Sequence, residues 1–332
     1  MILKLKSIGV GVVLCLGFFL WINTQVFALD KKASVSLSHY IMGAMYERLE
    51  EIDQAIAEYK KALKIDSKNS VIHLSLASSY IKKNEFDKAI EELKLVIQLD
   101  PEAIQPHAIL ALIYATQNKS TQASQEYEIA LKNAAKLEPK NIEIYKSLGL
   151  IYLQQKKLQE AKETFLLILE ISPLDTETHF YLANIYDELK NRPKAEEVLK
   201  KTLELNPDYH QALNYLGYLY VEENKNLDQA QGMINKAMEL EPNNGAYVDS
   251  LGWLYFKQGK LKEAIKELEK ATSLLKDPVI FDHLGDAYFK SGDIEKAKNN
   301  WQASLGLDDK QDKVKEKIES LSPKPQVPGL KK

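Results

Sequence analysis

The sequence predicts an all-α solenoid in which helix–turn–helix repeats are stacked and closed by a C-terminal capping helix. Three observations predict this fold class: a tyrosine that recurs about every 34 residues, a small residue three positions before it, and an alanine nine or ten positions after it. Self-similarity at such a period is typical of chains that stack one supersecondary unit many times. The tyrosines are Tyr46, Tyr80, Tyr114, Tyr152, Tyr186, Tyr220, Tyr255 and Tyr288.

Each repeat contains two predicted helices. In the first, a leucine or methionine four positions before the tyrosine and a glycine or alanine three positions before it lie with the tyrosine on one stripe, where the small residue lets a neighbouring helix approach closely. In the second, the alanine is followed four residues later by a bulky apolar side chain on the same face. These bulky residues are Tyr59, Leu93, Tyr127, Phe165, Leu199, Ile234, Leu268 and Trp301.

With these positions in this order, the chain resembles the tetratricopeptide repeat family, most closely its bacterial members in repeats seven and eight. The resemblance implies a right-handed superhelix of eight repeats over residues 36–309. The repeats are expected to begin near Ser36, Ser70, Ile104, Ile142, Thr176, His210, Gly245 and Pro278. Four extra residues near 133–136 lengthen the second helix of repeat three by about one turn, and repeat six has one extra residue near 224–228.

The two ends of the chain differ from the repeats. Residues 310–321 are predicted to form an amphipathic capping helix, which a solenoid needs to cover its open end. Three prolines in residues 322–332 predict a disordered tail. Residues 1–28 read as a signal peptide, because two lysines precede an uncharged apolar run that ends in a cleavage motif at Ala28. Residues 29–35 are then a short linker.

A retained signal anchor is the alternative for the N-terminal segment. The uncharged stretch from Ser7 to Leu29 has 23 residues, and about 20 are enough to cross a bilayer. Both interpretations place the repeats outside the cytoplasm, because Lys4 and Lys6 hold the N-terminus inside. The expected location is therefore periplasmic or otherwise extracytoplasmic, with an inner-membrane-anchored form facing the periplasm as the alternative.

Charge and cysteine content exclude several classes of function. Lys and Arg number 44 against 47 Asp and Glu, a formal charge of −3, which argues against a nucleic-acid partner that needs a basic surface. The single cysteine, Cys15, lies in the apolar N-terminal run, so the repeats contain no disulfide and no cysteine metal site. No cofactor is predicted.

Two residue groups suggest catalysis or metal binding, and spacing argues against both. Equivalent positions of stacked helices lie about 8–10 Å apart, whereas zinc ligands must all lie about 2 Å from one ion. Packing is therefore predicted for His39, His73, His107 and His179, which recur at one position of their repeats. Ser250, Asp282 and His283 are the residue types of a hydrolase triad, but no nucleophile elbow accompanies them. No enzyme is predicted.

The family resemblance implies that the first helices line a concave groove. In the C-terminal half this groove carries aromatic, amide and acidic side chains, and Trp253 is the expected binding hot spot, exposed beside Tyr218 and Asp249. Packing of Trp253 against Phe256 or Phe289 is the alternative. The candidate partner-binding residues are Asn184, Asn214, Tyr215, Tyr218, Asp249, Trp253, Asp282 and Asp286.

The chemistry of the groove bears on the partner. Amides such as Asn184 and Asn214 offer a donor and an acceptor to an extended peptide backbone. The acids Asp187, Asp249, Asp282 and Asp286 favour a basic or neutral partner, and the lysines and arginines that hold chaperone carboxylates in this family are missing apart from Lys146. The N-terminal half of the groove is mostly apolar and is expected to bind a second copy or an envelope protein. Its residues are Leu37, Tyr40, Ile41, Val71, Leu74, Ile81, Ile109 and Leu112.

These features predict a non-catalytic scaffold of the cell envelope that binds another envelope protein or an extended peptide in the groove, in envelope assembly or export. Two alternatives stay open. One is a membrane-anchored structural subunit that oligomerises through its N-terminal repeats. The other is a carbohydrate or small-ligand binder that uses Tyr215, Tyr218, Asp249 and Trp253.

Overall fold

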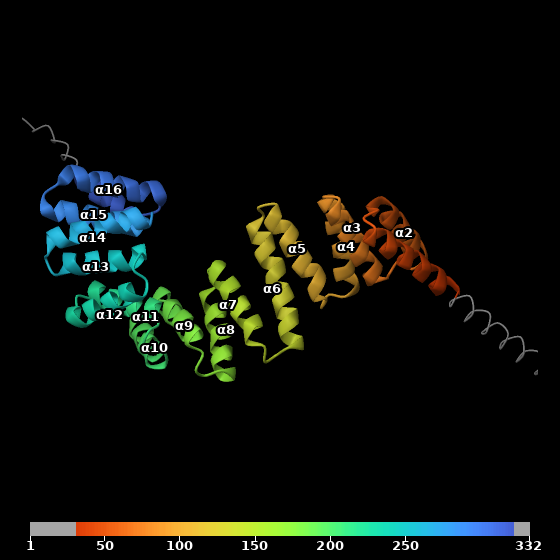
Figure 1. Ribbon diagram of the computed structural model, residues 1–332, viewed down its shortest axis with the longest axis horizontal. Coiled ribbons are helices and arrows are strands. Elements are labelled where there is room, and N and C mark those ends of the chain that lie inside the picture. Colours follow the sequence, from red (N-terminus) through yellow and green to blue (C-terminus); the bar gives the residue numbers. More distant parts are fainter. Residues whose placement is uncertain (1–30, 322–332) are drawn as a thin grey trace, which may run out of the picture. The chain divides into compact units, whose positions relative to one another are not determined.

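The computed structural model describes residues 31–321, and within them helices and short turns alternate without a strand (Figure 1). A helix at residues 31–48 comes first. The later first helices of the repeats are α3 (Ser70–Lys82), α5 (Ile104–Thr116), α7 (Ile142–Gln154), α9 (Thr176–Glu188), α11 (His210–Glu222), α13 (Gly245–Lys257) and α15 (Pro278–Ser291). Their starting residues are those that the repeat spacing predicts, so the predicted register is confirmed.

The second helices follow after turns of two to four residues. They are α2 (Ile52–Ile65), α4 (Phe86–Leu99), α6 (Ser120–Leu137), α8 (Leu158–Ile171), α10 (Arg192–Leu205), α12 (Leu227–Leu240), α14 (Leu261–Leu274) and α16 (Ile294–Leu307). The predicted capping helix is present as α17 (Asp312–Ser320). None of the helices within residues 31–321 is both long enough and apolar enough to span a bilayer.

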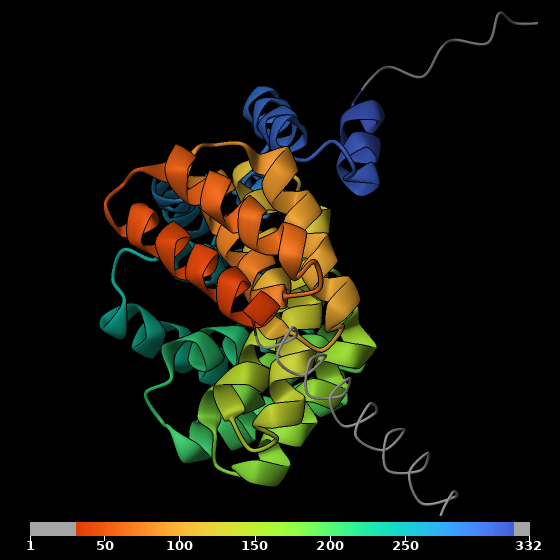
Figure 2. The same ribbon diagram turned by 90° about the vertical axis from the view of Figure 1, so that its right-hand side faces the viewer.

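The chain divides between Lys157 and Leu158 into two compact units, called here the N-terminal and the C-terminal unit. Inside each unit, consecutive helices pair, as α3 does with α4 and α15 with α16 (Figures 1 and 2). An apolar cluster of the N-terminal unit gathers buried residues from repeats one to three, Tyr59, Leu76 and Leu93 among them. The C-terminal unit has a similar cluster around Trp301, which includes Val314 of α17.

The small residue of each first helix lies against the bulky residue of the second helix. A Cβ atom added to Gly285 would lie 2.4 Å from the Trp301 ring, and one added to Gly252 would lie 2.7 Å from Leu268 Cγ. Gly43 has the same relation to Tyr59. The two backbones approach closely only because no side chain stands between them, which confirms the packing role predicted for the small residue.

The turn inside each repeat reverses the chain through one residue in the left-handed region. Glycine fills this position in the last two repeats, at Gly259 and Gly292, and asparagine, lysine or glutamate fills it elsewhere. The extra residue predicted in repeat six lies in such a turn, where Asn224 and Asn226 both have positive φ. Asparagine tolerates this conformation better than most residues, so the insertion is accommodated without disturbing the helices.

Neighbouring repeats are tied by charged side chains around the recurring tyrosine. Glu196 of α10 accepts a hydrogen bond from the Tyr220 hydroxyl of α11 at 3.2 Å. It also lies 2.7 Å from Lys200 Nζ and 2.8 Å from Lys225 Nζ. These lysines are the main cause that lowers the pKa of Glu196 to about 2. In the N-terminal unit, Glu128 holds two lysines beside the Tyr152 ring in a similar way.

One predicted boundary is wrong, and others cannot be compared. Residues 31–35, expected in a linker at 29–35, are helical, because the run Lys-Lys-Ala-Ser-Val contains no glycine or proline to stop the first helix. The predicted signal peptide at 1–28 and the tail at 322–332 lie outside the described residues.

Gly285→Ala is expected to lower the free energy of unfolding by about 1–3 kcal/mol, because the new methyl group forces Trp301 from its position. Gly232→Ala is the matched control. It also adds a methyl group to a helix, but nothing lies within 4 Å of that position, so it should stabilise by about 0.5–1 kcal/mol. Urea denaturation followed by circular dichroism measures both. Equal effects would contradict the close-contact account.

Glu196→Gln is expected to destabilise the protein at pH 7 by up to about 1 kcal/mol. The folded-state pKa lies below the ordinary value of 4.5, so the stabilisation is complete above that value and is lost as the pH falls towards 2. Wild type and variant should therefore converge in acid. Glu197→Gln, on the neighbouring exposed position, should show no such convergence in the same denaturation series.

Candidate functional site

Trp253, the expected hot spot, is buried rather than exposed. Only 7% of the residue is accessible, because its ring lies between Phe256, at a centroid distance of 4.5 Å, and His283, at 4.0 Å, both nearly parallel to it. Its Nε1 donates a hydrogen bond to Glu222 at 2.6 Å. The expectation of an exposed tryptophan is therefore wrong, and the alternative of packing against Phe256 is confirmed. Phe289 instead contacts Trp301.

Asp249 is also buried, with 6% of its surface accessible. It bonds His283 Nδ1 at 3.0 Å from the next repeat. Burial acts to lower the pKa of His283, but the charge and the hydrogen bond of Asp249 outweigh it, and the pKa is raised. A buried carboxylate needs such a partner, so this acid stabilises the contact between repeats seven and eight.

The capping helix supplies the partner for the next two acids. Lys317 Nζ of α17 lies 2.7 Å from a carboxylate oxygen of Asp282 and 2.7 Å from one of Asp286. Asp286 also accepts a hydrogen bond from Trp301 Nε1 at 3.1 Å. Burial raises the pKa of Asp286 more than Lys317 lowers it. Both carboxylates thus hold α17 in place.

Two of the remaining candidates, Tyr215 and Asn184, are hydrogen-bonded within the chain. The Tyr215 hydroxyl donates to Asp187 at 2.8 Å, and burial and this acceptor raise the pKa of Tyr215. Asn184 Nδ2 donates to the Phe180 carbonyl one turn earlier. Asn214 Oδ1 is buried and makes no hydrogen bond within residues 31–321. Tyr218 is half-buried, and burial raises its pKa.

The structure therefore brings many of the predicted site residues together, but they contact one another and other residues of the chain. Tyr218 lies 6.4 Å from the His283 ring, which itself covers one face of Trp253. Both faces of the indole are covered, so it offers no platform on which a sugar ring could stack. The acids Asp187, Asp249, Asp282 and Asp286 each have a partner in the chain. A role of these residues in partner binding stays a prediction.

Two of the recurring histidines, and the serine of the triad-like group, make hydrogen bonds within the fold. His73 Nδ1 lies 2.6 Å from Glu92, and His107 Nδ1 lies 2.6 Å from Glu126, each within its own repeat. Ser250 Oγ donates to the carbonyl of Ala246 rather than to His283. Residues 31–321 hold no group of three or more His, Cys, Asp or Glu side chains that would share one metal ion.

The N-terminal unit presents a different surface. Several apolar side chains on its first helices are exposed, Leu112 most of all with 68% of its surface accessible. We call the surface formed by the first helices the first-helix face. The predicted apolar residues Leu37, Ile41 and Val71 are also exposed on this unit. The other four predicted residues, Tyr40, Leu74, Ile81 and Ile109, are partly buried against the apolar cluster of this unit, so the expected apolar face is borne out for four of its eight residues.

Beside Leu112 lies an apolar groove of about 490 Å³ between α5, the start of α6, and α7. The groove exists because several of its lining side chains are small, namely Ala108, Ala111, Ala115 and Ala123. Its larger lining residues include Leu112, Tyr127 and Ile151. The groove has the size of a small-ligand site, and its lining accepts a bulky apolar side chain.

The four-residue insertion in repeat three accompanies the groove. α6 has 18 residues, whereas the other second helices have 14, as the sequence predicts. At the position of Ile151, repeats three, five, six, seven and eight bury an apolar residue, as Ile113 and Ile185 show. Ile151 is only half-buried and lines the groove instead. The lengthened helix thus coincides with a loosely covered junction between repeats three and four.

A polar recess adjoins the apolar groove and shares Ser120, Ser124 and Gln154 with it. Gln155 lines this recess, and both its Oε1 and its Nε2 are buried without a hydrogen bond inside residues 31–321. An unsatisfied buried amide costs about 1–3 kcal/mol per group. A ligand that offers a donor and an acceptor side by side, as a peptide backbone does, would remove that cost.

Sequence reasoning found Leu112 but missed Ile151 and Gln155. The available signal is the insertion at 133–136, from which only a longer helix is predicted. The sequence gives no signal for Gln155, because glutamine also stands at the same position in Gln117 and Gln258. The Oε1 atoms of these two glutamines are likewise buried without a hydrogen bond inside residues 31–321, and Gln155 differs in that its Nε2 is unsatisfied as well.

Comparison with known proteins identifies the repeat. Models described as "Tetratricopeptide repeat" match residues 48–113, 110–176, 176–209, 198–232, and both 249–276 and 280–311. A search of the curated proteins gave no match.

Solved structures share the fold at low sequence identity. A tetratricopeptide repeat protein from Parabacteroides merdae ATCC 43184 superposes with a TM-score of 0.57 at 20% identity, covering 75% of this chain and 97% of that one. A chain of the APC/C hetero-tetramer Cut9-Hcn1 gives 0.54 at 15% identity, covering 85% and 68%. Likeness at this identity shows the fold alone. Because the family models together match most of the sequence and the helices keep the register they require, the chain belongs to the tetratricopeptide repeat family.

Proposed function

We propose that this protein is a scaffold that holds an extended segment of another protein on the first-helix face of its N-terminal unit. Tetratricopeptide repeats form interaction scaffolds and are generally not catalytic. The observation that carries the proposal is the apolar groove beside Leu112, together with the unsatisfied Gln155 amide in the adjoining recess.

The two features define the chemistry of the partner. A leucine-sized or aromatic side chain fills the groove, and its transfer from water contributes about 1.5–3 kcal/mol. The neighbouring peptide unit then exchanges hydrogen bonds with Gln155. Exposed apolar residues at Leu37 and Val71 extend the same face towards the first repeat, so a longer segment has further apolar contacts.

We also propose that the protein works in the cell envelope, as a periplasmic or inner-membrane-anchored component in assembly or export. The support is the sequence of residues 1–28, which combines two lysines, an apolar run and a cleavage motif. The protein partner is then itself an envelope protein.

Leu112→Asp is expected to weaken peptide binding about 10-fold or more, since the buried apolar contact is replaced by a solvated charge. Peptides selected from a random display library on the purified chain serve as probes, and fluorescence anisotropy measures their affinity. Leu174→Asp is the control, because Leu174 is equally exposed but lies in the C-terminal unit. Selected peptides should carry a bulky apolar residue whose replacement has the same effect.

If Leu112→Asp binds as wild type does while the double variant Trp253→Ala, Tyr218→Ala loses binding, the proposed groove is wrong. The C-terminal cluster would then be the site.

Gln155→Leu is expected to weaken binding of the same peptides by a few-fold to about 10-fold, because the backbone loses its partner. The same change should leave the midpoint of urea denaturation unchanged or raised, since it removes an unsatisfied buried amide. A variant that loses stability and binding together would show that Gln155 only supports the fold.

A further inference from the structure

The helix at residues 31–48 exposes a stripe of apolar side chains. Val35, Met42, Met45 and Leu49 follow one another at spacings of seven, three and four residues, which places them on one side of a helix. Met42 is 41% accessible, Met45 57% and Leu49 64%. Such spacing is typical of the contact line between two packed helices. Within residues 31–321, no helix packs against this stripe.

Later repeats show which contact the equivalent residues make. The positions equivalent to Met42 and Met45 are Leu110 and Ile113 in repeat three, and Leu284 and Ala287 in repeat eight. All four are at least 97% buried, and in the last repeat they pack with Leu268 of the preceding second helix. The first repeat presents the same contact surface with no described helix on it.

The opposite end of the solenoid is closed. α17 inserts Val314 into the apolar cluster around Trp301, and Lys317 binds Asp282 and Asp286. The outward residues of α17 are mostly charged. Head-to-tail stacking on the last repeat would therefore have to displace α17 and break these contacts. A second copy offers the stripe an apolar surface of the same length, namely its own stripe.

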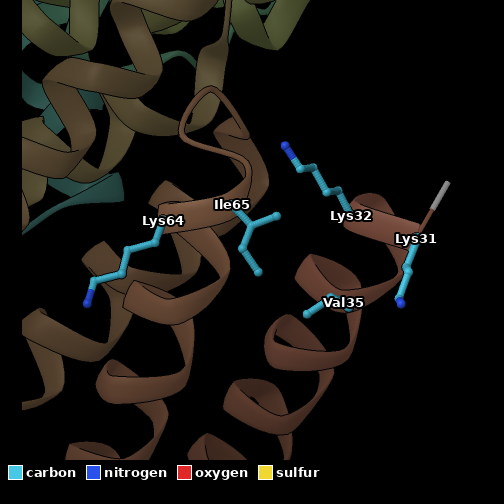
Figure 3. Close-up of a pocket in the computed structure, with 5 residues that line it drawn as sticks. All are labelled: Lys31, Lys32, Val35, Lys64 and Ile65. Carbon is cyan, nitrogen blue, oxygen red and sulfur yellow. The ribbon is translucent and has the colours of Figure 1, made fainter. Parts of the chain in front are cut away.

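If the stripes of two copies pack against each other, the charges along the helix at residues 31–48 favour an antiparallel arrangement of the two helices. Its start is basic, where Lys31 and Lys32 line a pocket with Val35 and with Lys64 and Ile65 of α2 (Figure 3). Its end carries Glu50 and Glu51, which outnumber the single Arg48. When two such helices run antiparallel, each basic start lies beside the acidic end of the other.

We propose that two copies of this chain associate head to head, about a two-fold axis that crosses the helix at residues 31–48 near Met42. The interface is isologous, so each stripe packs against the other copy's stripe. The dimer leaves the groove beside Leu112 outside the contact, because that groove is built from repeats three and four. The inference stands independently of the proposed peptide site.

Single cysteines test the arrangement in the full chain. In a Cys15→Ser background, Met42→Cys and Met45→Cys lie next to the axis and should each give a dimer of twice the 37.8 kDa chain mass when intact cells are treated with a short bismaleimide. Leu174→Cys, exposed in the C-terminal unit, should give only the background of random collision. Met45→Glu added to Met42→Cys should abolish the dimer.

The symmetry has its own test. Lys32→Cys and Glu50→Cys should each cross-link poorly alone but form a mixed dimer when differently tagged chains carrying one each are produced together. Lys31→Glu with Lys32→Glu should reduce the Met42→Cys dimer, and Glu50→Lys with Glu51→Lys in the same chain should restore it.

Three results would overturn the proposal. One is a Met42→Cys dimer no stronger than the Leu174→Cys control. Another is cross-linking of Lys32→Cys to itself, which would indicate parallel helices. The third is an internal link between Met42→Cys and the native Cys15 in a monomer, which would show that residues 1–30 of the same chain cover the stripe.

Discussion

The close contact between the two helices of each repeat is the constraint on which the structure depends. A glycine or alanine in the first helix lies against a bulky side chain of the second, as Gly285 lies against Trp301 and Gly252 against Leu268. Without a Cβ atom, or with only one, the bulky side chain can be buried against the backbone itself, which gives the pair its apolar interior. Once this contact fixes the pair, the tyrosine one turn later reaches the preceding repeat, and the turn residue must adopt a left-handed conformation. The regular stacking follows from these positions.

Exposed apolar surface occurs where this regularity is interrupted. Four additional residues in α6 coincide with a half-buried Ile151 and a groove whose floor is alanine. At the start of the chain the interruption is of a different kind, since the first helix has no described second helix before it, and Met42 and Met45 remain accessible. In both places a side chain that the repeat pattern would bury is left to contact something else. A repeat protein therefore gains interaction surfaces by breaking its own pattern.

Charged residues behave in the opposite way in the C-terminal unit. Asp249, Asp282 and Asp286 look available in the sequence because they stand at groove positions, but each is largely desolvated and needs a partner nearby. His283 and Lys317 provide these partners. Lys317 belongs to the capping helix. The acids for which the sequence predicts a basic partner therefore already bind a basic residue of their own chain. The capping helix thus covers these acids of α15.

The sequence by itself determined the fold class, the starts of the first helices from Ser70 to Pro278, the longer second helix of repeat three and the capping helix. All of these depend on local spacing, which a helix translates directly into a face. Only the tertiary structure decided which residues on a face are covered. Trp253 and Leu112 occupy the same position of their repeats, yet the first is buried between Phe256 and His283 and the second is exposed. Burial depends on the side chains of the neighbouring repeats, and spacing within one helix carries no information about them.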